Sequence, residues 1–210
     1  LFVGCSNNDI AVEKTEEIKT PEEIYLIAKQ FFDNKAYDLS KEEFLQLKKL
    51  YPLTNEAIQA EIMIGFISYL KMDYETAIAQ FELVTKKYPS HKNLDYVYYM
   101  IAISYYEQIT HHSLDGKFNE LALLNFNQVI NRFANSDYAK DSRQKIILIK
   151  SNKAAKNMDI GRFYLKEKKY TAALNRFSIV MNDYSMTKFT PEALHRIVEI
   201  YYEMGMIDES

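Results

Sequence analysis

The chain has 210 residues, 48% of them hydrophobic, so it is long and apolar enough to bury a core, and disorder throughout is excluded. Only 5 glycines and 4 prolines occur, which argues against a loop-rich all-β chain or a glycine-looped nucleotide-binding fold and favours long helices. The 26 basic and 29 acidic residues give a net charge of −3, so we expect no nucleic-acid partner.

Residues 1–20 are predicted to be a lipoprotein-signal remnant followed by a flexible tether. Leu1-Phe2-Val3-Gly4-Cys5-Ser6 resembles the end of a bacterial lipoprotein signal, in which a small residue precedes the lipid-accepting cysteine. The chain starts with Leu rather than Met, which we interpret as removal of a leader. Acyl chains on Cys5 would hold the domain at a membrane without a spanning helix. In the alternative interpretation, Cys5 is a free thiol.

A repeated motif begins at residue 21: a small residue on one helix, then Ala or Ser and Phe on the next. It reads Ala28, Ser40 and Phe44 in 21–54, and Gly65, Ala77 and Phe81 in 58–91. The motif resembles the tetratricopeptide repeat (TPR), whose helix pairs stack into a solenoid. The small residue lets the second helix approach closely, and we expect the Phe to fill the gap to the next unit. We therefore predict an all-α, TPR-like α-solenoid of about five helix pairs.

The second half of the chain continues the motif after a longer spacing. A third repeat starts near Asp95 and carries a short insertion, and residues 137–168 contain no proline, which predicts one helix of about 48 Å linking repeats three and four. The fourth repeat has Gly161, Ala173 and Phe177, and the fifth starts at Pro191. The fifth repeat lacks its second helix, which a stable solenoid would need as a cap. We predict two blocks, 21–136 and 137–210.

The segment 88–100 is more distinctive than a generic repeat. It reads Tyr-Pro-Ser-His-Lys-Asn-Leu-Asp-Tyr-Val-Tyr-Tyr-Met and resembles the BamD family, the outer-membrane lipoproteins of the β-barrel assembly machinery. Further matches are Asn135–Ala139 and Leu174-Asn175-Arg176, and departures include Lys92 and Ser185, each where proline is usual. From the residues alone, Asn93 or Asp95 is expected to cap a helix and His91 to hydrogen-bond within the linker.

The resemblance implies a non-enzymatic lipoprotein subunit of the outer-membrane β-barrel assembly complex, anchored at the periplasmic face of the outer membrane. It implies that the protein binds the periplasmic repeats of BamA, other lipoproteins of the complex and unfolded β-barrel proteins, with Arg176 as a BamA contact. One alternative is another periplasmic TPR lipoprotein that scaffolds cell-envelope or cell-wall machinery. Another is a soluble cytoplasmic TPR adaptor.

A substrate groove is the sharpest expectation from the residues. If TPR geometry holds, the first helix of each pair lines a groove, and its candidate residues are Tyr25, Phe32, Ile62, Phe66, Tyr69, Tyr96, Tyr99 and Tyr106. Such an aromatic groove would suit extended peptides that contain aromatic side chains. Alternatively, these rings pack between repeats as core. Tyr25 and Ile62 occupy the sites where carboxylate-binding repeats carry lysine, so a clamp for a terminal carboxylate is not expected.

Catalytic and metal-binding patterns are absent from the sequence. It contains no Gly-x-Ser-x-Gly, His-Glu-x-x-His or Walker-type motif, so no enzymatic activity and no cofactor are expected. His111 and His112 are adjacent, would point apart on a helix and have no acidic or cysteine partner at metal spacing, so we interpret them as loop residues and expect no metal. The single cysteine excludes an internal disulfide framework.

Overall fold

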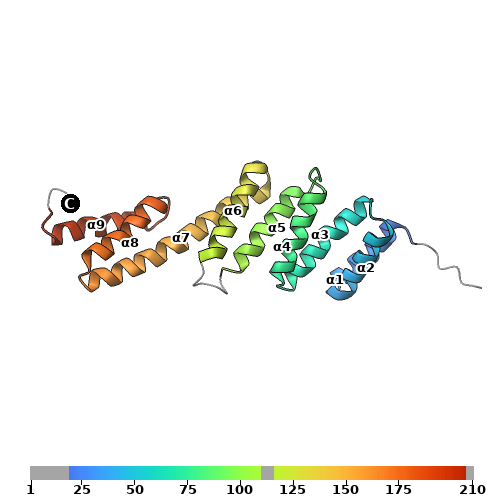
Figure 1. Ribbon diagram of the computed structural model, residues 1–210, viewed down its shortest axis with the longest axis horizontal. Coiled ribbons are helices and arrows are strands. Elements are labelled where there is room, and N and C mark those ends of the chain that lie inside the picture. Colours follow the sequence, from blue (N-terminus) through green and yellow to red (C-terminus); the bar gives the residue numbers. More distant parts are fainter. Residues whose placement is uncertain (1–18, 110–115, 207–210) are drawn as a thin grey trace, which may run out of the picture. The chain divides into compact units, whose positions relative to one another are not determined.

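The computed structural model describes residues 19–109 and 116–206. These residues form nine helices and no strand (Figure 1), which confirms the predicted all-α, TPR-like fold. The helices are α1 (Pro21–Asp33), α2 (Tyr37–Leu50), α3 (Asn55–Leu70), α4 (Tyr74–Lys87), α5 (Leu94–Glu107), α6 (Gly116–Arg132), α7 (Asp137–Lys166), α8 (Tyr170–Asp183) and α9 (Thr190–Glu203). Cys5, His111 and His112 lie outside the described residues.

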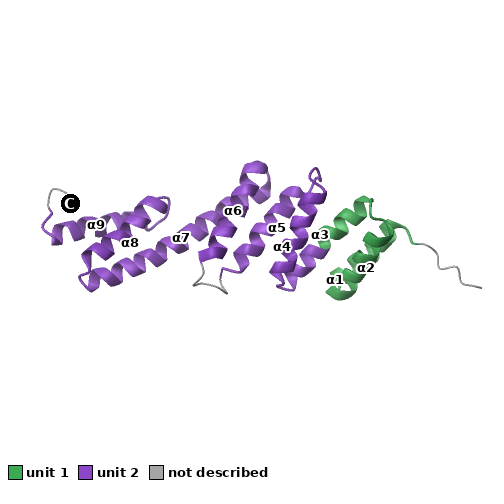
Figure 2. Ribbon diagram, in the orientation of Figure 1, with its two compact units in different colours: residues 1–63 green, residues 64–210 purple. Residues whose placement is uncertain are grey.

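The chain divides into two compact units, residues 1–63 and residues 64–210 (Figure 2). The boundary falls inside α3, whereas the predicted blocks divide at residue 137. The predicted division falls immediately before α7, which begins at Asp137 and packs against α5, α6 and α8. As a division of function, the two blocks remain a prediction.

Local signals explain where the helices begin. At α1 the Glu23 backbone N–H donates to Thr20 Oγ1 (3.3 Å) and the Thr20 N–H donates to Glu23 Oε2 (2.8 Å), which forms a capping box, and Pro21 occupies the first turn. At α7 the Ala139 N–H donates to Ser136 Oγ at 3.1 Å. α7 then runs for 30 residues, about 45 Å, close to the predicted helix.

The turn after the first helix of a pair recurs with the same backbone conformation. Lys35, Met72 and Lys168 have φ values of 60°, 61° and 56°, in the left-handed region that favours glycine. Each residue follows the first helix of its pair, after α1, α3 and α7 respectively. Three repeats therefore reverse the chain direction in the same way, without a glycine at this position.

The repeated motif forms the core of the helix pairs. The four equivalent phenylalanines are fully buried: Phe44, Phe81, Phe126 and Phe177. A Cβ atom on Gly65 would lie 2.9 Å from Phe81 Cε1, so the absence of a side chain at Gly65 makes room for the ring. The ring thus packs against the small residue of its own pair, and Phe177 also shares a buried cluster with Ala193 and Ile200 of the next repeat, as expected for a residue that fills the gap between units.

In the first pair a hydrogen bond joins the small residue to the second helix. The buried Ser40 hydroxyl on α2 donates to the Ala28 carbonyl oxygen on α1 at 2.8 Å, and both residues are fully buried. Because the donor is a side chain on one helix and the acceptor is backbone on the other, the bond sets how closely the two helices approach. The predicted Ala28–Ser40 pairing is therefore confirmed.

The last three helices share one cluster of buried side chains. It comprises Ala154 and Met158 of α7, Ala173, Phe177 and Val180 of α8, and Ala193 and Ile200 of α9. α7 therefore belongs to the core of the fourth repeat as well as to the packing of the third, which confirms the predicted linking helix.

Candidate binding surfaces

Helices α3, α5 and α7 bring five rings together within the second unit. We call Phe66, Tyr69, Tyr96, Tyr99 and Tyr138 the aromatic cluster. Its centroid distances are 6.2 Å for Phe66–Tyr69, 6.4 Å for Phe66–Tyr96, 5.5 Å for Tyr96–Tyr138 and 5.2 Å for Tyr99–Tyr138. All five side chains are half-buried, so the rings support one another and also keep part of their surface in solvent.

The structure adds Tyr138 to the predicted groove residues. It stands in the Asn135–Ala139 segment that carries part of the family resemblance, but it belongs to α7, and the groove prediction considered only the first helices of the first three repeats. Tyr138 lies in the first turn of α7, just after Ser136. This position would indicate a place in the aromatic cluster only to a reader who already knows that α7 packs against α5. Sequence spacing alone does not supply that contact.

Hydrogen bonding fixes the orientation of Tyr99. Its hydroxyl donates to Asp141 Oδ2 at 2.7 Å, which joins α5 to α7. Burial, this hydrogen bond and the Asp141 charge raise the pKa of Tyr99, and burial followed by the neighbouring Tyr138 raises the pKa of Tyr96. Burial and the Glu107 charge raise the pKa of Tyr69. The hydroxyls therefore remain neutral near pH 7 and can donate hydrogen bonds.

Tyr106 follows Tyr99 on α5 by seven residues, about two turns of the helix, and is not part of the aromatic cluster. Its ring packs on Phe126 with centroids 6.1 Å apart, and Lys145 Nζ lies 4.8 Å from its centroid. The Tyr106 ring therefore contacts the buried Phe126 and also lies close to the positive charge of Lys145, which is attracted to an aromatic face.

The predicted groove residues of the first unit have different surroundings. The Tyr25 ring packs on the buried Phe44 with centroids 5.5 Å apart, and Phe32 packs on Tyr37 at 5.6 Å. Tyr25 and Phe32 are half-buried. Ile62 is only 4% exposed, so its side chain belongs to the core and does not present a surface. Ile62 was predicted as a groove residue from its position on the first helix of its repeat. Its burial corrects that prediction.

Arg176 lies on α8 and is half-buried. Its Nη1 donates to Asn157 Oδ1 on α7 at 3.3 Å, so the side chain crosses to the neighbouring helix instead of extending freely into solvent. This single bond occupies a small part of a guanidinium that carries five N–H donors. Its proposed contact with a partner remains a prediction.

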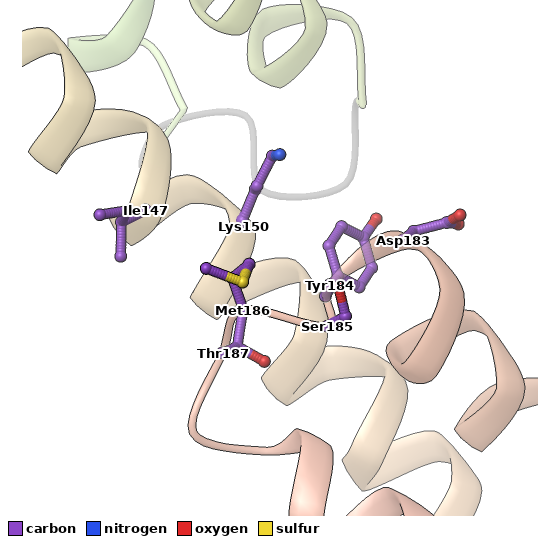
Figure 3. A pocket seen from close by; sticks show the side chains of 7 residues that line it. All are labelled: Ile147, Lys150, Asp183, Tyr184, Ser185, Met186 and Thr187. Carbon is purple, nitrogen blue, oxygen red and sulfur yellow. The ribbon is translucent and has the colours of Figure 1, made fainter.

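A small pocket of about 70 Å³ lies between α7 and the end of α8. Figure 3 shows Ile147 and Lys150 on α7 and, across from them, the segment that runs from α8 towards α9, which contributes Asp183, Tyr184, Ser185, Met186 and Thr187. Met186 is 91% exposed and Ile147 51%. The buried Thr187 hydroxyl has no hydrogen-bond partner among the described residues. Ser185, where the repeat pattern has proline, is therefore part of a hollow on this face.

The segment 88–100 has the local bonding that was expected for His91. His91 Nδ1 accepts from the Asn93 backbone N–H at 3.3 Å, which confirms its role within the linker. Burial and the charge of Lys92 lower the pKa of His91, so the ring is neutral near pH 7 and free to accept. The expected cap is corrected: the Asn93 side chain makes no capping bond, and Asp95 Oδ1 accepts from the adjacent Tyr96 N–H.

Two absences apply to residues 19–109 and 116–206. No cluster of His, Cys, Asp and Glu side chains there has the make-up of a metal site. Nor does any described helix combine the length and the apolar character that crossing a bilayer requires.

Helix pairs with buried phenylalanines and a half-buried aromatic cluster together define a TPR-like protein. The comparison with known families agrees with this class: the model of YfiO, described as an outer membrane lipoprotein, matches residues 17–210. The chain therefore belongs to this family, which confirms the BamD resemblance.

Curated relatives share one name, outer membrane protein assembly factor BamD. The chain is 38% identical to the protein of Rickettsia prowazekii (strain Madrid E) over 178 residues, which cover 85% of this chain and 71% of that protein. It is 30% identical over 207 residues to the protein of Caulobacter vibrioides (99% and 68% covered). It is 23% identical over 218 residues to that of Vibrio cholerae serotype O1 (99% and 89% covered).

Proposed function

We propose that this chain is a non-enzymatic lipoprotein subunit of the outer-membrane β-barrel assembly complex. In this proposal a lipid on Cys5 anchors it at the periplasmic face of the outer membrane, and it binds BamA, other lipoproteins of the complex and unfolded β-barrel proteins. The shared name of its curated relatives supports a role in outer membrane assembly. Mass analysis of the mature N-terminus tests the anchor, since an unmodified Cys5 contradicts it.

The aromatic cluster is the observation that carries substrate binding. Its five rings are half-buried and pack on one another, and the Tyr99–Asp141 bond holds one of them in place. A surface whose side chains are already fixed loses little conformational entropy when a ligand binds. Neutral hydroxyls beside apolar rings suit an extended strand, whose backbone needs hydrogen-bond partners and whose aromatic side chains can stack.

The negative charges around the aromatic cluster indicate which groups of a bound peptide the cluster would contact. Glu107 lies close enough to raise the pKa of Tyr69 and Tyr99, and Asp141 adds a second carboxylate. A peptide's terminal carboxylate would be repelled by these groups, whereas its aromatic side chains would not. We expect recognition through side chains of the strand, and an affinity at least as high for a peptide whose C-terminus is amidated.

A peptide-binding experiment tests this surface. A labelled peptide with the sequence of a barrel's last strand, ending in Phe, is titrated with the full chain and followed by fluorescence anisotropy. Tyr69→Ala is expected to weaken binding about tenfold, because one stacked aromatic contact with its buried area is lost. Tyr202→Ala is the matched control, since Tyr202 is 68% exposed on α9, outside the aromatic cluster. Equal affinities for the two variants would contradict the substrate role.

The BamA contact is tested through Arg176. Arg176→Glu reverses the charge at the position that the family resemblance assigns to BamA, and it is expected to weaken binding to isolated BamA periplasmic repeats. Lys166→Glu, an exposed residue at the end of α7, makes the same charge change as a control. Unchanged binding by Arg176→Glu removes this residue from the interface. Capture of cell-wall synthases with no capture of BamA would favour the alternative, an envelope scaffold.

A further inference from the structure

A second hollow, about 280 Å³, lies in the second unit where α4 ends, α5 begins and α6 ends. We call it the Tyr98–Arg132 pocket, and its lining residues are Thr85, Pro89, Leu94, Tyr98, Arg132 and Phe133. Pro89, Leu94 and Tyr98 belong to the distinctive segment 88–100. Neither proposed binding surface uses these side chains.

The pocket faces away from the aromatic cluster. Tyr98 and Tyr99 are neighbours on α5, so their side chains diverge by about 100° around the helix. Tyr99 bonds Asp141 on α7, whereas Tyr98 packs on Phe133 with centroids 5.7 Å apart. A ligand in the Tyr98–Arg132 pocket would therefore leave the aromatic cluster open.

Arg132 is held in an arrangement that leaves its donors available. Its guanidinium carbon lies 4.9 Å from the centre of the Tyr98 ring. Stacking uses the flat face of a guanidinium, while its N–H groups project around the edge in the plane where a carboxylate binds. Phe133, on the next position of the chain, packs on the same tyrosine and restricts that ring.

Arg132 also differs from the other arginines in its hydrogen bonding. Of the five arginines in the sequence, four donate to partners within the described part of the chain: Arg143 to Ala134 O, Arg162 to Glu192 and Asp159, Arg176 to Asn157, and Arg196 to Glu199. Arg132 donates to none of the described residues and makes only its contact with the ring. Among the five arginines, Arg132 is therefore the one whose N–H groups have no hydrogen-bond acceptor within the described part of the chain.

The charge and polarity of the lining indicate the ligand. Arg132 is the only charged residue among the six, and Pro89, Leu94 and Phe133 supply apolar walls. Lys92 is exposed on the segment that borders the pocket and adds a second positive charge near it, whereas the exposed Lys86 pairs with Glu82 at 4.0 Å. One guanidinium balances one negative charge, which matches a carboxylate better than a phosphate, and the apolar walls match a side-chain stem.

We propose that the Tyr98–Arg132 pocket binds an acidic side chain, Glu or Asp, of a partner polypeptide. The edge of the Arg132 guanidinium donates to the carboxylate, the Tyr98 hydroxyl is a second available donor, and the apolar walls contact the neighbouring residue of the partner. This site is separate from the proposed substrate and BamA surfaces, so it can succeed or fail independently of them.

Nuclear magnetic resonance of the full chain tests the proposal, because each arginine Nε–H gives its own signal and the other four arginines serve as internal controls. The probes are acetyl-Ala-Glu-Leu-Ala-amide, the same peptide with Gln in place of Glu, and inorganic phosphate. The Glu peptide is expected to shift the Arg132 signal and to bind about tenfold more tightly than the Gln peptide, the ratio expected for a hydrogen bond to a charged group.

Variants separate recognition from general attraction. Arg132→Gln and Arg132→Lys are expected to abolish the preference for Glu, because neither supplies a stacked, charged fork, and Tyr98→Phe is expected to reduce it while keeping the stack. Far-ultraviolet circular dichroism checks that each variant is folded. The proposal is overturned if the two peptides bind equally well or if the Glu peptide does not shift the Arg132 signal. It is also overturned if phosphate shifts that signal more strongly than the Glu peptide, or if Arg132→Lys keeps the full preference for the Glu peptide.

Discussion

Gly161 on α7 touches the ring of Phe177 on α8 so closely that a Cβ atom at Gly161 would lie 2.6 Å from Cε1. Phe177 is fully buried and belongs to the cluster that joins the last three helices. The ring cannot move away without disturbing its other neighbours, because protein cores are close-packed. The glycine is thus a packing requirement of the fourth helix pair, in which the end of α7 packs against α8.

Replacing this glycine is expected to destabilise the protein. Gly161→Ala gains helix propensity of about 1 kcal/mol, but the forced shift of the ring costs about 1–3 kcal/mol, so we expect a net loss that urea unfolding can measure. Gly116→Ala is the control, since no atom of residues 19–109 or 116–206 lies within 4 Å of a Cβ atom there. If both variants had the same stability, the contact would carry no energetic weight.

The left-handed turn residues give a prediction of opposite sign. Met72 has φ 61° and is 72% exposed, so its side chain adds little packing while its backbone is strained. Met72→Gly is expected to raise the free energy of unfolding by up to about 1 kcal/mol, because glycine adopts this conformation without the Cβ clash. Lys71→Gly, one position earlier, has no such strain to relieve and is expected to lower stability. Thermal unfolding of the two variants distinguishes these outcomes.

The hydroxyl of Tyr99 is expected to contribute to the α5–α7 contact. Tyr99→Phe removes the 2.7 Å bond to Asp141 and keeps the ring, so we expect a loss of about 1 kcal/mol in the free energy of unfolding. Tyr98→Phe is matched in chemistry and position, and its hydroxyl donates to none of the described residues. A double-mutant cycle of Tyr99→Phe with Asp141→Asn measures the coupling directly, and a coupling of zero would show that the bond is not formed in solution.

The same tyrosines predict alkaline sensitivity. The pKa values of Tyr96 and Tyr99 are raised from 10.0, mainly by burial, so their hydroxyls stay protonated in the folded chain at a pH where an unfolded tyrosine ionises. Their contribution to stability is therefore complete below pH 10 and declines as the pH rises above it. Absorbance near 295 nm during titration checks this, and ionisation of all tyrosines together near pH 10 would contradict it.

The Arg162–Glu192 pair predicts an effect at acid pH. Arg162 donates to both Glu192 oxygens, at 2.9 and 2.6 Å, and these bonds lower the pKa of Glu192 from 4.5. A lowered carboxyl pKa adds stability above pH 4.5 that is lost as the pH falls through the folded value. Both side chains are more than a third exposed, so we expect at most about 1 kcal/mol.

Glu192→Gln is expected to remove this part of the acid dependence, which unfolding at about pH 6 and pH 3 measures. Glu203→Gln, an exposed carboxylate on the same helix, is the control and is expected to leave the dependence unchanged. If both variants reduced the pH dependence of stability equally, the Arg162–Glu192 pair would not be its source, and the proposed link between α7 and α9 would be contradicted.

The helix pairs and the long helix were predictable from the residues alone. Small residues and phenylalanines recur at repeat spacing, and the long helix predicted to begin at residue 137 does begin there. These signals act within one helix or between two consecutive helices, and such local geometry follows from the helical period. The same reasoning explains why the long α7 was predicted to within two residues at its end.

The particular side-chain contacts between helices were decided by the tertiary structure. Burial of Ile62, the entry of Tyr138 into the aromatic cluster and the crossing of Arg176 to Asn157 each depend on which helix packs against which and on the direction of each side chain. The stacking of Arg132 on Tyr98 is of the same kind. A repeat pattern assigns residues to helices, but only the packed helices determine which side chains meet, because the distance between those residues in the chain does not set their separation in space.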